Sequence, residues 1–140
     1  MSSGELHNEV RRWLRFAHED LRAAEALLTE AESRPRHACW LAQQAAEKAI
    51  KAALAHQQIP FPFRHDLDAL RNLLPEGWTV KAQYPDLAEL TEWAVEARYP
   101  GDWPEATGDD ARRAVDQARG VWQCVAHDLT ARGVRVEELP

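Results

Sequence analysis

The sequence is short of several residues and patterns that would point to particular classes of protein. Its 140 residues include only two cysteines, Cys39 and Cys124, which cannot form a disulfide framework and are typical of a reducing compartment. No apolar run approaches the roughly 20 residues that a membrane-spanning helix needs. The first residues also lack the basic start and apolar stretch of a signal peptide. We therefore expect a cytoplasmic protein without a membrane segment.

Acidic residues outnumber basic ones, with 23 Asp and Glu against 17 Lys and Arg. The formal net charge of −6 disfavours binding to duplex DNA, because such binding depends on neutralising many phosphates. Lysine is the rarer cation, since Lys48, Lys51 and Lys81 are the only lysines in the chain. Two of the three lie within one turn of the same predicted helix. A local basic site for a small anion is therefore compatible with the acidic balance of the whole chain.

Several motifs of well-known chemistry are missing. The sequence contains no GxxxxGK[ST] or GxGxxG loop for phosphates and no GxSxG nucleophile elbow. His65-Asp66 and His127-Asp128 are pairs of the kind that bind metal in some helical phosphohydrolases, but the further His and Asp ligands are not suitably spaced. We therefore expect neither a metal site nor a cofactor.

The residues that are present predict one all-α domain over residues 1–140. The chain is 45% apolar and 29% charged, as in ordinary globular proteins, and its length suits a single domain. The predicted architecture is an antiparallel up-and-down helical bundle with four main helices and one short helix.

A helix over residues 36–57 is predicted to lie at the centre of this bundle. Its apolar face is mostly alanine, and such small side chains allow neighbouring helices to approach closely. The predicted buried positions are Cys39, Ala42, Ala46, Ala49, Ile50, Ala53 and Leu54.

The other helices follow from apolar spacing and from capping residues. Ser2-Ser3-Gly4-Glu5 is a capping box before a long first helix, and Thr107-Gly108-Asp109-Asp110 is a capping signal before a long last helix that Gly133 ends. Asp66 is expected to begin a short helix with Leu67, Leu70, Leu73 and Leu74 buried. Pro85 and Asp86 are expected to open a further helix that ends before Pro100. Residues 78–83 are predicted to form a loop, and residues 134–140 a short tail.

A polar strip on the central helix is the candidate functional feature. Gln44, Glu47, Lys48 and Lys51 lie beside or opposite the alanine face. Glu47 and Lys51 have the spacing of an ordinary helical ion pair, so this strip is also compatible with a purely structural role. Arg98 lies on the inward side at the end of the predicted fourth helix, where it is suited either to capping the last carbonyls or to binding phosphate.

Four stretches together resemble the HEPN family, named for a nucleotide-binding domain of higher eukaryotes and prokaryotes. They are Gln43 to Ala52, His65-Asp66-Leu67, Arg98-Tyr99-Pro100 and the alanine-rich last helix, and the resemblance runs from about Leu6 to Leu129. Arg98-Tyr99-Pro100 is similar to the RYP-type branch. The resemblance implies a helical bundle that is commonly a homodimer, is often encoded beside a minimal nucleotidyltransferase, and in many members is a metal-independent ribonuclease of toxin–antitoxin or defence systems.

The resemblance implies that Arg98 corresponds to the family's arginine. The histidine that follows four to six residues later in nuclease members is absent, because Asp102, Trp103 and Pro104 occupy those positions. Enzymatic activity and catalytic residues are therefore left open. Our leading interpretation is a module that binds a nucleotide or RNA phosphate and acts with a nucleotidyltransferase partner. Its expected binding residues are Arg98, Tyr99, Lys48, Lys51, Gln44 and Glu47.

Two alternatives from other classes remain open. The first is a ribonuclease toxin, in which another histidine such as His65, or one from a second protomer, reaches Arg98. The second is a dimerisation or partner-binding bundle without a ligand. The chain has six tryptophans, and Trp40 and Trp93 lie off the central stripes of their helices, as interface aromatics often do.

Overall fold

A computed structural model describes residues 2–62, 65–96 and 104–136, with only the backbone described for residues 95 and 96. These residues contain helices and no strand, which confirms the predicted all-α bundle. The helices are α1 (Ser3–Leu27), α2 (Pro35–His56), α3 (Leu67–Asn72), α4 (Thr79–Gln83), α5 (Ala88–Glu96) and α6 (Gly108–Ala131). None of the helices in these ranges is long and apolar enough to span a membrane.

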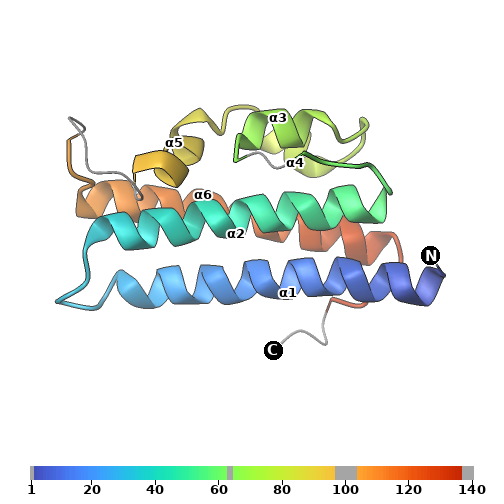
Figure 1. The fold of residues 1–140 in the computed structure, drawn as a ribbon, viewed down its shortest axis with the longest axis horizontal. Helices are drawn as coiled ribbons and strands as arrows, with labels where there is room; N and C mark the ends of the chain where they lie inside the picture. Colours follow the sequence, from blue (N-terminus) through green and yellow to red (C-terminus); the bar gives the residue numbers. More distant parts are fainter. Residues whose placement is uncertain (1, 63–64, 97–103, 137–140) are drawn as a thin grey trace.

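The chain crosses the length of the molecule four times (Figure 1). α1 and α2 run in opposite directions as a long helical hairpin. The three short helices α3, α4 and α5 together carry the chain back to the end where α2 began, so that α6 runs beside α2 in the same direction. α2 contacts α1, α3, α5 and α6, and is therefore the central element of the bundle.

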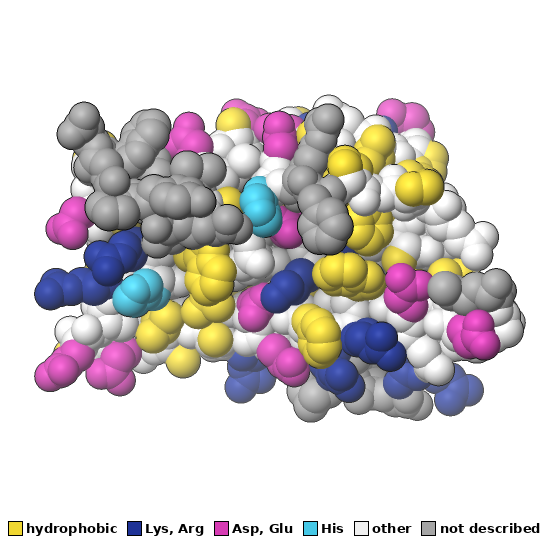
Figure 2. Space-filling view, in the orientation of Figure 1, with side chains coloured by type: hydrophobic (Ala, Val, Ile, Leu, Met, Phe, Trp, Pro, Cys, Tyr) yellow, Lys and Arg dark blue, Asp and Glu magenta, His cyan; other side chains and the backbone are white. Residues whose placement is uncertain are grey.

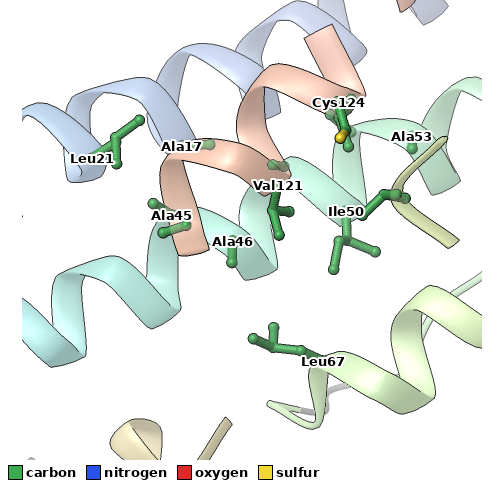
Figure 3. Packing of buried hydrophobic residues seen from close by; sticks show 14 of the residues in the cluster. Ala17, Leu21, Ala45, Ala46, Ile50, Ala53, Leu67, Val121 and Cys124 are labelled. Atoms are coloured by element: carbon green, nitrogen blue, oxygen red, sulfur yellow. The ribbon is translucent and has the colours of Figure 1, made fainter. Parts of the chain in front are cut away.

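The alanines of α2 explain its central position. Every residue of its predicted apolar face is buried, which confirms that prediction, and the burial extends around the helix to Ala38, Ala45, Ala52 and Ala55. A helix that is apolar on nearly all sides has to be covered on all sides. Figure 3 shows this packing: side chains of α2 such as Ala45 and Ile50 lie among Leu21 of α1, Val121 of α6 and Leu67 of α3.

The predicted helix starts are confirmed at three places. Ser2 with Glu5, and Thr107 with Asp110, form reciprocal capping boxes at the starts of α1 and α6. The side chain of Asp66 accepts a hydrogen bond from the backbone N–H of Ala69 at 3.1 Å and caps α3. Local sequence signals therefore specify these helix boundaries.

The prediction of a loop over residues 78–83 is wrong, because Thr79–Gln83 is the short helix α4. Its first turn is stabilised from a distant element. The carboxylate of Asp128 on α6 accepts hydrogen bonds from the backbone N–H of Thr79 at 2.6 Å and from its hydroxyl at 3.0 Å. A cap supplied 49 residues later in the chain leaves no local signal.

Several apolar residues also differ from expectation. Leu73, predicted to be buried, is 41% exposed, whereas the adjacent Leu74 is buried as predicted. Trp93, considered as a surface aromatic, is instead buried in the core. Val134 and Val136 are buried as well, so residues 134–136 pack onto the bundle and are not a free tail.

A close approach between Tyr84 and α6 fixes the chain between α4 and α5. A Cβ atom added to Gly120 would lie 1.6 Å from the Tyr84 hydroxyl oxygen and 2.5 Å from Cζ. We expect Gly120→Ala to lower the free energy of unfolding by about 1–3 kcal/mol, because overpacking outweighs the better helix propensity of alanine. Urea unfolding of Gly120→Ala and of Gly120→Ala/Tyr84→Ala tests this, since removal of the ring should restore part of the loss. Wild-type stability in Gly120→Ala would contradict the prediction.

Candidate functional site

A buried carboxylate on α2 lies at the centre of the candidate site. Glu47 is only 4% exposed, and both of its oxygens have partners. Oε2 accepts a hydrogen bond from Lys51 Nζ at 2.9 Å, and Oε1 lies 2.8 Å from His65 Nδ1. The side-chain amide of Gln43 also donates to Oε1, at 3.2 Å. Glu47 therefore joins α2 to the segment that precedes α3.

His65 is held at two points by this arrangement. Its ring meets Glu47, and its backbone carbonyl accepts a second hydrogen bond from Gln43 Nε2, at 3.1 Å. Gln43 is fully buried, and its own carbonyl oxygen accepts a hydrogen bond from Gln44 Nε2 at 2.7 Å. The His65 side chain is nevertheless 45% exposed. Two buried residues of α2 thus orient a histidine that is accessible from solvent.

The charge of Glu47 determines how His65 carries its proton. Burial raises the pKa of the Glu47 carboxyl, but hydrogen bonds from Lys51, His65 and Gln43 and the charge of Lys51 outweigh it, so the pKa lies below its ordinary value. An ionised carboxylate only accepts hydrogen bonds, so Nδ1 of His65 carries the proton that it donates. In the neutral ring Nε2 is then the basic atom.

Lys51 lies inside the protein, at the end of the same network. It is 7% exposed, and its ammonium group lies 5.6 Å from the ring centroid of Trp13 and 5.5 Å from that of Phe61. Glu47 is its ion-pair partner, so the ammonium lies near one carboxylate and two aromatic rings. The predicted contact of Lys51 with phosphate stays a prediction, and it would require this ion pair to open.

Lys48 and Gln44 lie nearer the surface. Lys48 Nζ is 2.5 Å from the carboxylate of Asp20 on α1, and the lysine side chain is 26% exposed. Gln44 is half-buried and is oriented by Gln43. Asp20 was not expected here, because nothing in the sequence of α1 indicates which residue of α2 it faces. Lys48 can reach a ligand only by sharing or leaving Asp20.

The remaining predicted binding residues, Arg98 and Tyr99, lie outside the described residues, so the prediction of their roles stays as it was. Gln43 and His65, which the structure brings to Glu47, were not among the predicted binding residues. A signal for Gln43 is present in the sequence, since it stands one turn before Glu47 within the alanine face. The contact between residues 47 and 65 depends on the fold of the connecting segment and has no local signal.

The aspartates of the two His-Asp pairs serve as helix caps. Asp66 and Asp128 cap α3 and α4, respectively, while His127 is exposed on α6. Within residues 2–62, 65–96 and 104–136, no three His, Cys, Asp or Glu side chains lie together as metal ligands would.

Comparison with known proteins places the chain in a family. The model of the HEPN domain matches residues 10–129. A solved structure, the crystal structure of TT1696 from Thermus thermophilus, is similar with a TM-score of 0.69 and 30% sequence identity, over 86% of this chain and 98% of that one. No curated protein matches the sequence. Both the sequence over most of its length and the arrangement of its helices therefore show that the chain belongs to the HEPN family.

Proposed function

We propose that this chain binds a nucleotide or an RNA phosphate at the surface where the polar residues of α2 meet His65. The observation that carries the proposal is a buried carboxylate, Glu47, that orients a half-exposed imidazole at 2.8 Å. Membership of the HEPN family supports a function related to nucleotides or RNA. Arg98 and Tyr99, with Lys48 and Gln44, complete the proposed site.

The energetics of the network favour a functional reason for it. Removing a carboxylate and an ammonium from water costs several kcal/mol per ion, and a buried ion pair is often no more stable than apolar residues of similar size. The Glu47–Lys51 pair is buried on the central helix α2, so it carries this cost. Its benefit is the fixed position of His65 at the proposed site, while Arg98 can form a two-point contact with phosphate.

A titration with a fluorescently labelled single-stranded RNA tests the proposal. We expect the Lys48→Ala/Arg98→Ala variant to bind about 10- to 100-fold more weakly than wild type, because charge-assisted hydrogen bonds to phosphate are lost. The matched control is Arg112→Ala/Arg113→Ala, which removes the same charge from the exposed start of α6. Equal affinity of wild type and the Lys48→Ala/Arg98→Ala variant would overturn the proposal.

The proposal extends to the partner protein and to the oligomeric state of the chain. The Arg98-Tyr99-Pro100 sequence supports placement in the RYP-type branch. The resemblance to the HEPN family implies a minimal nucleotidyltransferase partner and a toxin–antitoxin or defence role. We also propose a homodimer. Co-purification with a nucleotidyltransferase encoded beside this chain, and sedimentation at micromolar concentration, address these two points separately.

The Glu47–His65 pair favours a second candidate function, a metal-independent ribonuclease. A histidine oriented through Nδ1 by a carboxylate has its other nitrogen suited to general acid–base chemistry. His65 would take the proton of a ribose 2′-OH, whose oxygen attacks the adjacent phosphorus as the bond to the 5′-oxygen breaks and that oxygen receives a proton. Cleavage in EDTA that depends on His65 would distinguish this activity from binding alone.

A further inference from the structure

A pair of aromatic side chains lies next to the residues of the proposed binding site. Trp13 on α1 and Phe61 in the segment after α2 meet edge to face, with ring centroids 5.8 Å apart and planes at 77°. Both side chains pack on the core, but both are only partly buried. Each of the two residues is therefore partly accessible from solvent.

This pair is connected to His65 through a single buried ion pair. The ammonium of Lys51 lies within 5.6 Å of both ring centroids and 2.9 Å from one oxygen of Glu47, whose other oxygen holds His65. Both Lys51 and Glu47 are more than nine-tenths buried on the rigid α2. The rings and the imidazole are therefore held at a fixed spacing, one on each side of the Lys51–Glu47 pair.

The face of the molecule formed by α1 and α2 carries both apolar and charged side chains. Figure 2 shows hydrophobic side chains on this face, with Lys and Arg as well as Asp and Glu side chains among them and a His side chain close by. Aromatic surface beside cationic groups is how proteins bind single-stranded nucleic acids, because every base offers a π-face and every phosphate a charge. Duplexes are poorer ligands for such a surface, since their bases are already stacked on one another.

We infer that the Trp13–Phe61 pair is a stacking surface for the base of a nucleotide or of single-stranded RNA whose phosphate lies at His65. This inference rests on the proposed function and adds to it the part of the ligand that is recognised. A ligand bound through its phosphate alone would contact only the part of the site around His65. Stacking makes the site select ligands that carry an unpaired base.

The test compares two ligands that differ only in the base. Adenosine 5′-monophosphate and ribose 5-phosphate are titrated calorimetrically against wild type, Phe61→Leu and Phe61→Tyr. We expect wild type to prefer the nucleotide by about 5- to 150-fold, the range for one stacked base. Phe61→Leu should lose most of this preference while binding ribose 5-phosphate as wild type does, and Phe61→Tyr should keep it. Phe16→Leu is the matched control, because Phe16 is an exposed aromatic residue of α1 that does not contact Lys51 in this structure.

The possible failures are distinguishable. If wild type binds both ligands equally, the proposed phosphate site stands and the stacking surface is overturned. If wild type binds neither ligand, both the site and the stacking surface fail. If Phe61→Leu keeps the preference for the nucleotide but abolishes self-association in sedimentation, the aromatic pair is a protein interface and the inference is wrong.

Discussion

Replacing Glu47 by glutamine is expected to lower the free energy of unfolding by about 3–5 kcal/mol, the cost of leaving a buried charge without its partner. Glutamine keeps the shape of the side chain but removes the negative charge that faces Lys51 at 2.9 Å. Lys51 is 7% exposed and lies beside the rings of Trp13 and Phe61, so little water is available to replace Glu47 as its partner. Urea unfolding followed by circular dichroism measures the loss.

A double variant separates the charge effect from a packing effect. Glu47→Gln/Lys51→Met replaces both charges by neutral groups of similar volume, and we expect it to recover most of the stability lost in Glu47→Gln. Glu89→Gln is the control for an exposed pair, since Glu89 contacts Arg113 at the surface and little change is expected. A double variant as unstable as Glu47→Gln would mean that the hydrogen bonds to Gln43 and His65 account for the loss.

The same carboxylate predicts a pH dependence. Because the folded protein holds the pKa of Glu47 below its ordinary value of 4.5, the ionised form stabilises the fold. This contribution is complete above about pH 4.5 and is lost as the pH falls through the lowered pKa of the folded state. The difference in stability between wild type and Glu47→Gln should therefore shrink on acidification below about pH 4.5.

If the chain cleaves RNA, His65→Ala is expected to lower the rate by about 10²- to 10⁴-fold, the usual contribution of a general acid or base. The assay is cleavage of a labelled, mixed-sequence RNA in EDTA, with Arg98→Ala as the variant that excludes a contaminating nuclease. His127→Ala is the matched control, because His127 is an exposed histidine on α6. Undiminished cleavage by His65→Ala would assign the proton transfer to another group, and cleavage by no protein would leave phosphate binding as the function.

The fold was predictable where each element carries its own signal. The alanine face of α2 and the caps at Ser2, Asp66 and Thr107 lie within the helices that they specify or at their ends. α4 was missed because its cap is Asp128, a residue of another helix. An apolar pattern with a local cap is thus sufficient to predict a helix, whereas a helix stabilised from elsewhere requires the tertiary structure.

The candidate site was predictable only on α2. The spacing of Glu47 and Lys51 indicates their ion pair, and the structure shows that pair at 2.9 Å. The packing of α1 and of the segment after α2 against α2 decides the other contacts. It places Lys51 beside Trp13 and Phe61, and Lys48 opposite Asp20. The same is true of His65, because a contact across 18 residues is set by the path of the connecting chain.

The burial of most of α2 has a consequence for how the site can respond to a ligand. Because α1, α3, α5 and α6 all contact this helix, its amide hydrogens around Gln43 and Glu47 should exchange with solvent only when the whole domain unfolds. The backbone of α2 is then not expected to change when a ligand binds. We therefore expect Glu47 to keep the same position with and without a ligand.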